Sequence, residues 1–554
     1  MTDSADPNRT YVQFLSAFST IGLVVAAIFF GLSVTPSMVP RAPELQGILG
    51  GVVASIGYLV WWLAFKFLEW LGVPVARALS RNIRLGFGSL AMAVVAASLW
   101  KAADWQNSIL AAWGLAPIDA TAPLRIAVIG GAVFLGLLVA GRTFAILART
   151  WQRRSQNVLP PRLAQAAGLV ASVAIFAALV EGFAFRAALR TIDASARIAD
   201  AIVLPDLEPP VSPFDSGGPN SLLAWEDLGR WGRVFVASGP SAEDIAAFWD
   251  EPAHDPIRVY IGLNAAITPE ARAQLALDEL RRVDGFDRAI LVIAMPTGSG
   301  WLDPGSMDTL DYMARGDVAT VAVQYSYLPS PVSVVVDPTA GMSEAQALFD
   351  IVYRHWTALA PEDRPQLYLH GLSLGAFLSQ ETVPLLDLYA DPIDGALWTG
   401  SPYLSEFWQM VRARRHAASP EWRPRFGNGS LVRTTNQHGG LEPFDADWGP
   451  MRFVLLQYGS DPIVFFDWSL AWSRPAWLSG ERAPDLSPEM RWIPVVTLFQ
   501  VGLDMAVALG TLGFGHDYVA RDYIPAWSAT LAPEGWTEGD EARLVAHLRD
   551  LVPR

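Results

Sequence analysis

The chain has 554 residues, of which 52% are hydrophobic, 17% are charged and none is cysteine. Without cysteine there can be no disulfide, no thiolate metal site and no cysteine nucleophile. The net charge of −15 lacks the basic footprint of proteins that bind nucleic acids, so we expect no nucleic-acid partner.

Long apolar runs in the first third predict a helical membrane domain over residues 1–203, with the lipid bilayer as its partner. A helix needs about 20 mostly apolar residues to cross a bilayer. Five segments qualify: Val12–Leu32, Gly47–Trp70, Leu85–Trp100, Leu124–Leu147 and Leu163–Phe185. The first is too long for a signal peptide and lacks a small-residue cleavage site, so we expect it to be retained. Lys66, Glu69 and Glu181 lie near span ends, and we interpret them as interfacial side chains rather than a transport site.

The distribution of arginine predicts the orientation of these spans. Arginines gather between the second and third spans and between the fourth and fifth, at Arg77, Arg81, Arg84, Arg142, Arg149, Arg153, Arg154 and Arg162. Positively charged loops stay in the cytoplasm. We therefore expect a cytoplasmic N-terminus in a bacterial inner membrane, and a C-terminal part that is periplasmic or extracellular. Arg186, Arg190 and Arg197, directly after the fifth span, weigh against this orientation.

Residues 204–220 predict a linker, because Pro205–Pro219 holds five prolines and two glycines. From residue 221 to 554, short apolar runs alternate with helical patterns, which is typical of a doubly wound, mainly parallel sheet. The predicted strands are Arg233–Ser238, Ile257–Gly262, Ala289–Ala294, Val318–Gln324, Gln366–His370, Gly395–Thr399 and Arg452–Gln457. The predicted helices are Ser241–Asp250, Thr268–Val283, Ser343–Leu359 with a capping box, Ala376–Leu386 and Glu538–Leu551.

Two stretches interrupt this alternation and are predicted to be insertions over the top of the sheet, residues 401–450 and 465–513. The second is apolar and aromatic, and we expect it to form a lid or an acyl pocket. Periodicity does not decide whether its later part holds a strand at Val495–Phe499 or a helix.

The candidate nucleophile is Ser373, in the sequence His370-Gly-Leu-Ser-Leu-Gly375. This sequence follows a predicted strand and precedes a predicted helix, which is the setting of a nucleophile elbow. Gly371 and Gly375 allow the close backbone approach that so tight a turn needs. A turn of small residues without catalytic function is the alternative.

A serine hydroxyl needs a base to become a good nucleophile. Where such an elbow is used, the chain order is serine, acid, histidine. His516 is the preferred base because it lies in a glycine-flanked loop, Gly513–Tyr518, whereas His547 lies inside the final predicted helix. His438, with Asp445 or Asp447 nearby, would invert the chain order.

The preferred acid is Asp461, which follows an apolar strand and a Gly-Ser turn and would orient His516. Asp467 is the second choice. An aspartate in a turn before proline, without catalytic function, is the alternative.

An oxyanion hole needs two N–H donors. Leu374 supplies one in the elbow. The loop Ala294–Trp301 supplies the other, through Thr297 or Gly298, because Pro296 has no N–H. An ordinary glycine-rich turn is again the alternative.

The four motifs Pro296-Thr-Gly-Ser-Gly300, His370–Gly375, Gly459-Ser-Asp-Pro462 and Gly515-His-Asp517 resemble a bacterial α/β-hydrolase family. That family joins a multi-span N-terminal membrane domain to a C-terminal hydrolase domain. The resemblance extends over nearly the whole chain. It implies a Ser-Asp-His hydrolase and gives no substrate. The long segment between Asp461 and His516 departs from the pattern and leaves the position of the last strand open.

We expect a membrane-anchored esterase or lipase that cleaves lipid-like acyl esters through an acyl-enzyme. Two alternatives stay open: an acyltransferase that uses the same triad, and a membrane protein that uses the hydrolase fold for binding alone. No metal or cofactor is expected, because the histidines lack zinc-helix spacing and Gly298–Gly300 lacks a P-loop lysine. The oligomeric state is not readable from the sequence.

Overall fold

A computed structural model of the chain describes residues 19–73, 80–156, 195–203, 207–328, 339–383, 385–442 and 446–551, with a few isolated positions between them. The chain forms two compact units, each treated by itself below. Unit 1 comprises Met1–Ala187, Asp467–Ser479 and Pro484–Val507, and unit 2 comprises Ala188–Phe466, Gly480–Ala483 and Ala508–Arg554. This division differs from the expected one, because most of the predicted insertion 465–513 belongs to unit 1.

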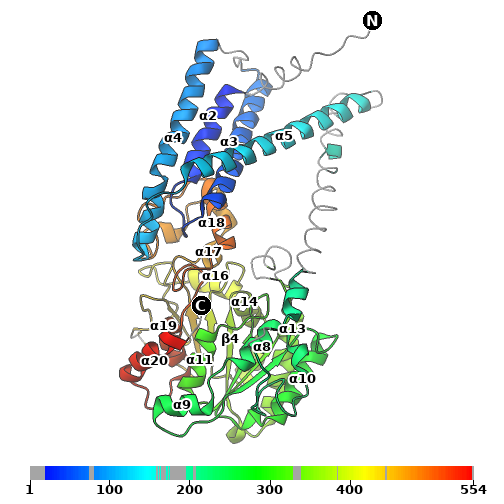
Figure 1. Cartoon of the computed structure of the whole chain (residues 1–554), viewed down its shortest axis with the longest axis vertical. Helices are drawn as coiled ribbons and strands as arrows, with labels where there is room; N and C mark the ends of the chain where they lie inside the picture. The colour runs from blue at the N-terminus through cyan, green and yellow to red at the C-terminus, as the bar shows by residue number, and fades with distance from the viewer. Residues whose placement is uncertain are drawn as a thin grey trace. The chain divides into compact units, whose positions relative to one another are not determined.

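In the described part of its N-terminal segment, unit 1 has four helices: α2 (Thr20–Ser33), α3 (Pro43–Trp70), α4 (Arg81–Ala112) and α5 (Pro123–Ser155) (Figure 1). Helices α3, α4 and α5 are long and apolar enough to cross a membrane. Helix α2 has 14 residues, fewer than a crossing needs, and the start of the predicted first span lies outside the described residues. The predicted span Leu163–Phe185 and Glu181 also lie almost entirely outside them. Within the described part of the chain there are thus three candidate spans, against five predicted.

Glycines allow α3 to pack closely on its neighbours. A Cβ added at Gly51 would lie 2.6 Å from the carbonyl oxygen of Gly130 in α5, and one at Gly50 would lie 2.6 Å from the ring of Phe30 in α2. Small residues at such crossings are typical of helices that pack in a membrane. Near the end of α3, Lys66 and Glu69 pair with each other at 2.8 Å and stay partly exposed, which supports the interfacial interpretation.

The segment inserted late in the chain adds the short helices η5 (Trp468–Ala471) and η6 (Ala476–Leu478) and the helix α18 (Val496–Ala506) to unit 1. Of the two possibilities left open for Val495–Phe499, the structure has the helix, which begins at Val496 with Val495 as its N-cap. Val496 is buried with Leu49 and Val53 of α3, and partly buried apolar side chains of α2 and α18 join them. Within unit 1, the apolar face of α18 packs on α2 and α3. That residues 465–513 lie over the sheet as a lid stays a prediction.

Unit 2 contains a seven-stranded sheet in the order β1-β3-β2-β4-β5-β7-β6. All six strand pairs are parallel. The strands are β1 (Ile257–Ile261), β2 (Ile290–Met295), β3 (Val318–Val323), β4 (Gln366–Leu372), β5 (Gly395–Thr399), β6 (Val432–Thr435) and β7 (Arg452–Leu456). Nearly every strand residue is buried, as expected for a parallel sheet covered on both faces. The predicted doubly wound, mainly parallel sheet is confirmed.

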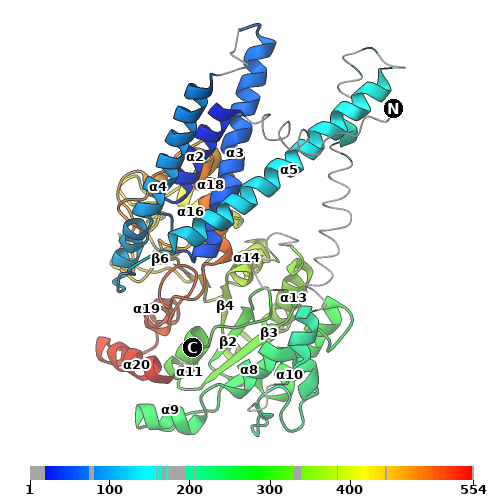
Figure 2. The same cartoon turned by 45° about the horizontal axis from the view of Figure 1, so that its top comes forward.

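Two groups of helices flank this sheet. Helices α10 (Pro269–Arg282), α13 (Met342–Ala358) and α14 (Leu374–Glu381) contact one another in succession and pack on the strands β1 to β4. Helices α11 (Pro304–Met313), α19 (Ala520–Leu531) and α20 (Glu538–Leu551) form the second group, in which α19 packs on β5 and β7. Figure 2 shows the strands β2, β3 and β4 between α11 and α13. Two further helices are α8 (Gly229–Ala237) and α9 (Ala242–Trp249).

Two local predictions differ from the structure. The predicted strand Arg233–Ser238 is wrong, because Arg233–Ala237 lie in α8 and Ser238 is its C-cap. Gly232 and Phe235, three residues apart on one face of this helix, both lie against the Tyr260 ring. The predicted capping box of Ser343 is absent, since α13 begins at Met342 and its N-cap, Gly341, has no side chain.

The predicted insertion 401–450 holds the helix α16 (Glu406–Ala413) and the strand β6. This strand occupies the edge next to β7 although it precedes β7 in the chain. The sequence left the position of the last strand open. In the structure the edge position next to β7 is taken by β6, which precedes Asp461 in the chain.

Candidate active site

The residue Ser373 lies in a strained turn between β4 and α14. Its backbone has φ 59° and ψ −125°, a region that costs a non-glycine residue on the order of 1–3 kcal/mol. A Cβ at Gly375 would lie 2.1 Å from the carbonyl oxygen of Met295, and one at Gly371 would lie 2.5 Å from the carbonyl of Gly375. Both elbow glycines are therefore required by space, as the sequence motif indicates.

The structure brings His516 and Asp461 together. Nδ1 of His516 lies 2.6 Å from Oδ2 of Asp461, and the other carboxylate oxygen accepts the N–H of Ile463 at 2.9 Å. Asp461 is fully buried and His516 is 5% exposed. An imidazole held this way by a buried carboxylate presents Nε2 for proton transfer.

Two residues missed by the sequence reasoning support this pair. The hydroxyl of Tyr518 donates to Oδ2 of Asp461 at 2.9 Å. Oγ of Ser460 accepts the N–H of Gly515 at 3.0 Å, which joins the loop that carries the acid to the loop that carries the base. Both residues are adjacent or nearly adjacent to predicted site residues, but no sequence pattern indicates such contacts.

The end of β5 brings Ser373 and His516 into one neighbourhood. The N–H of Ser373 donates to the carbonyl of Thr399 at 3.0 Å. At the next residue, Gly400, a Cβ would lie 2.6 Å from Cε1 of His516. Oγ of Ser373 and Nε2 of His516 are both buried and have no hydrogen-bond partner among the described residues. Catalytic hydrogen bonds of this kind often form only when substrate is bound.

The predicted oxyanion loop lies beside the elbow, as its contact with Gly375 shows. Leu374 is the first residue of α14, so its N–H has no acceptor within the helix. The N–H of Thr297, in contrast, donates to the carbonyl of Trp301 at 2.9 Å. Thr297 could serve only by giving up this bond, so the assignment of the second donor to Gly298 stays a prediction.

The other histidines near the site or considered as bases have different surroundings. His370 is buried between Oγ of Ser306 and the carbonyl of Leu397. Burial lowers its pKa to about 4, which leaves a neutral structural side chain. His438 is exposed in a tight turn, and its backbone carbonyl accepts a hydrogen bond from Arg423. Asp445 lies outside the described residues.

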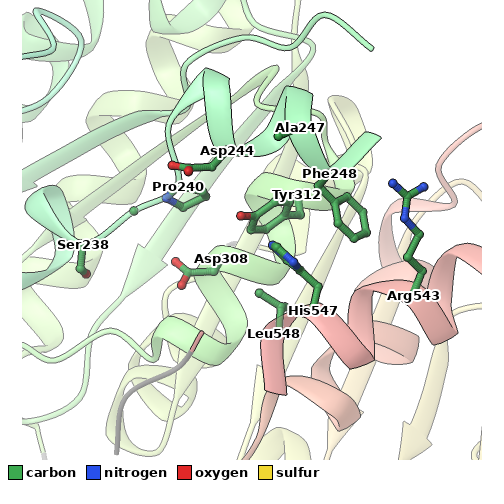
Figure 3. Close-up of a pocket in the computed structure, with 11 residues that line it drawn as sticks. Ser238, Pro240, Asp244, Ala247, Phe248, Asp308, Tyr312, Arg543, His547 and Leu548 are labelled. Carbon is green, nitrogen blue, oxygen red and sulfur yellow. The ribbon is translucent and has the colours of Figure 1, made fainter. Parts of the chain in front are cut away.

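The last competing histidine, His547, lines a pocket of about 500 Å³ in unit 2 that contains none of the proposed catalytic residues. Figure 3 shows its ring beside Phe248 and Tyr312, with Arg543 on the same helix. The ring centroids of both neighbours lie 4.9 Å from that of His547. The competing acid, Asp467, is exposed, belongs to unit 1 and caps η5.

The comparison with known proteins identifies the family. The sequence model of the Alpha/beta-hydrolase family matches residues 257–544, and the model of the same family's N-terminus matches residues 34–240. The chain therefore belongs to this Alpha/beta-hydrolase family, as its motifs indicate. No curated protein and no solved structure matches it. Within the described part of the chain, no cluster of three or more His, Asp or Glu side chains could hold a metal ion.

Proposed function

We propose that the protein is a membrane-anchored serine hydrolase that cleaves acyl esters with Ser373, His516 and Asp461. The observation that carries this proposal is the buried bond between His516 and Asp461, close to a serine held in a strained elbow. Family membership and the three apolar helices of unit 1 support the two coarser parts, a hydrolase and a membrane anchor.

The proposed reaction has two halves. Oγ of Ser373 attacks the ester carbonyl carbon while Nε2 of His516 takes its proton, and the Leu374 N–H stabilises the oxyanion. Collapse of the tetrahedral intermediate breaks the bond to the alcohol, which leaves with the proton from His516. Water then attacks the acyl-enzyme by the same route and releases the acid, which restores Ser373. Asp461 stays ionised and stabilises the imidazolium.

The test is the reaction of the full-length protein with a fluorophosphonate probe and with p-nitrophenyl esters. We expect labelling of the wild type and none of Ser373→Ala, with turnover falling by roughly 10⁶-fold, as when a serine protease loses its nucleophile. Equal labelling of both proteins would show that Ser373 is not the nucleophile.

Acyl transfer is the second candidate, and the burial of Ser373 and His516 favours it, because a transferase must keep water from the acyl-enzyme. Product analysis with and without a lipid or glycan alcohol separates the two. A new ester formed in the presence of the alcohol indicates transfer. Free acid alone, at an unchanged rate, indicates hydrolysis.

A further inference from the structure

The chain segment between the proposed acid and base is held in unit 1. The chain enters unit 1 at Asp467, shortly after Asp461, and leaves it for the last time at Val507, shortly before His516; only Gly480–Ala483 of this stretch belong to unit 2. The anchoring of this segment within unit 1 therefore bears on two of the three proposed catalytic groups through the continuity of the chain.

A buried polar network anchors the segment. The carboxylate of Asp504, in α18, accepts three hydrogen bonds. They come from Nε of Arg41 at 2.7 Å, from the N–H of Met38 at 3.0 Å and from the hydroxyl of Ser37. Nη2 of Arg41 in turn donates to the carbonyl of Gln500 at 3.2 Å. The side chains of Arg41 and Asp504 are both 0% exposed.

Apolar packing alone could hold α18 against α2 and α3. Apolar contacts are not directional, however, so they do not fix one position of the helix. A buried ion pair adds little net stability compared with an apolar pair of the same shape, because both charges lose their water. It does, however, impose one geometry, since any shift of α18 would leave a charge unpaired. The network thus fixes where α18 sits on the loop between α2 and α3.

We propose that Arg41 and Asp504 are positioning residues for the hydrolytic reaction. They fix α18 in unit 1 and thereby hold the two ends of the segment from which Asp461 and His516 extend. The membrane unit then has a role beyond anchoring, since it sets the geometry of the acid and the base. This inference rests on the proposed function.

The experiment uses the full-length chain in lipid nanodiscs and a short, soluble p-nitrophenyl ester. Arg41→Met and Asp504→Asn each leave one partner of the pair unmatched. We expect kcat to fall on the order of 10²-fold, the cost of misplacing catalytic groups by about 1 Å. KM should stay within about two-fold, because the substrate pocket itself is unchanged and only the placement of catalytic groups is affected. Ser37→Ala removes one donor only and should lower kcat less, again without changing KM.

Arg125→Ala is the matched control. It breaks another ion pair of unit 1, to Glu44 at 2.7 Å, which is exposed and does not involve the inserted segment. We expect it to keep the kcat and KM of the wild type. If Arg41→Met and Asp504→Asn fold and also keep both constants, the inference is wrong. If they do not fold, Ser37→Ala decides by the same criterion.

Failure of the proposed function has a different signature. In that case the wild type itself would show no more turnover and no more fluorophosphonate labelling than Ser373→Ala. A wild type that is active, with anchoring variants that are equally active, would count against the positioning role alone.

Discussion

The Tyr518 hydroxyl gives Asp461 a third hydrogen bond, besides those from His516 and the N–H of Ile463. The Tyr518 ring stacks on Tyr458 with centroids 4.1 Å apart, so the position of the hydroxyl is fixed. Tyr458 itself donates to Asp522 and not to Asp461. A carboxylate held from three sides cannot rotate away from the imidazole, which keeps His516 in the orientation that proton transfer requires.

We therefore expect Tyr518→Phe to lower kcat by roughly ten-fold, which corresponds to a hydrogen bond to a charged group worth about 1.5 kcal/mol. KM for a short ester should not change, because the hydroxyl lies behind the imidazole. Tyr458→Phe is the control for loss of a buried phenol hydroxyl. Equal kcat values in the two variants would contradict a special role for Tyr518.

A second buried carboxyl, Asp303, makes the stability of unit 2 depend on pH. Its oxygens accept the N–H of Gly305 and the hydroxyl of Tyr523, both at 2.9 Å. Burial raises its pKa to about 7, above the value of about 3.9 expected in the unfolded chain. The folded state thus favours the protonated form. This contribution to stability is complete below pH ~4 and is lost as pH rises toward 7.

Asp303→Asn, which cannot titrate, should accordingly lose less stability than the wild type between pH 5 and pH 8. The measurement is Tm at one-unit pH steps. Asp250→Asn controls for the loss of one charge, at an exposed left-handed position that asparagine tolerates. If Tm of the wild type and of Asp303→Asn falls in parallel over this range, burial does not raise the pKa of Asp303.

At the scale of elements, the junction of β4 and α14 is the most constrained part of the sheet. A methyl group at position 375 would overlap the carbonyl oxygens of Met295 and Pro296, so β2 and α14 could not both keep their places. We expect Gly375→Ala to lower the unfolding free energy by about 1–3 kcal/mol, as overpacking does, and to abolish probe labelling. Gly539→Ala is the control, because its nearest neighbour lies 3.5 Å away. Thermal melting and labelling check both.

The sequence predicts the strands of the sheet well because most of them are short, mainly apolar runs between helical patterns. Their predicted limits differ from β1 to β5 and β7 by no more than two residues. It fails at α8, where β-branched residues suggest a strand but the structure has a helix whose Gly232 and Phe235 pack on the Tyr260 ring. It also misses β6, a four-residue edge strand too short to give a pattern.

The candidate site likewise has features that the sequence predicts and features that it does not. The elbow around Ser373 is local in sequence, so its geometry is predictable from five residues. The partnership of Asp461 and His516 is predictable only from the chain order typical of such elbows. The bond from Tyr518 and the close approach of Gly400 depend on how distant loops meet, and nothing in the sequence marks them.

At the scale of the whole molecule, the contacts of the inserted segment bear on topology. Within unit 1 this segment meets the arginine-poor ends of the helices. Nε1 of Trp113, just after α4, donates to the carbonyl of Asp485 at 2.9 Å, and Asp504 pairs with Arg41 just before α3. The arginine-rich ends are the opposite ones, which should face the cytoplasm. We then expect the inserted segment on the outer side of the membrane. The residues that flank it belong to unit 2, so we expect unit 2 on that side as well.

This topology requires one more crossing after α5, which the predicted span Leu163–Phe185 would supply. Because the chain has no cysteine, single cysteines can report the side of the membrane directly. We expect Ile267→Cys in unit 2 and Asp119→Cys between α4 and α5 to react with a membrane-impermeant maleimide in intact bacterial spheroplasts. Arg153→Cys, near the end of α5, should react only after the membrane is permeabilised. All three positions are exposed, so a failure to react reports the membrane rather than burial. Labelling of Arg153→Cys without that of Ile267→Cys would reverse the orientation and place the hydrolase unit in the cytoplasm.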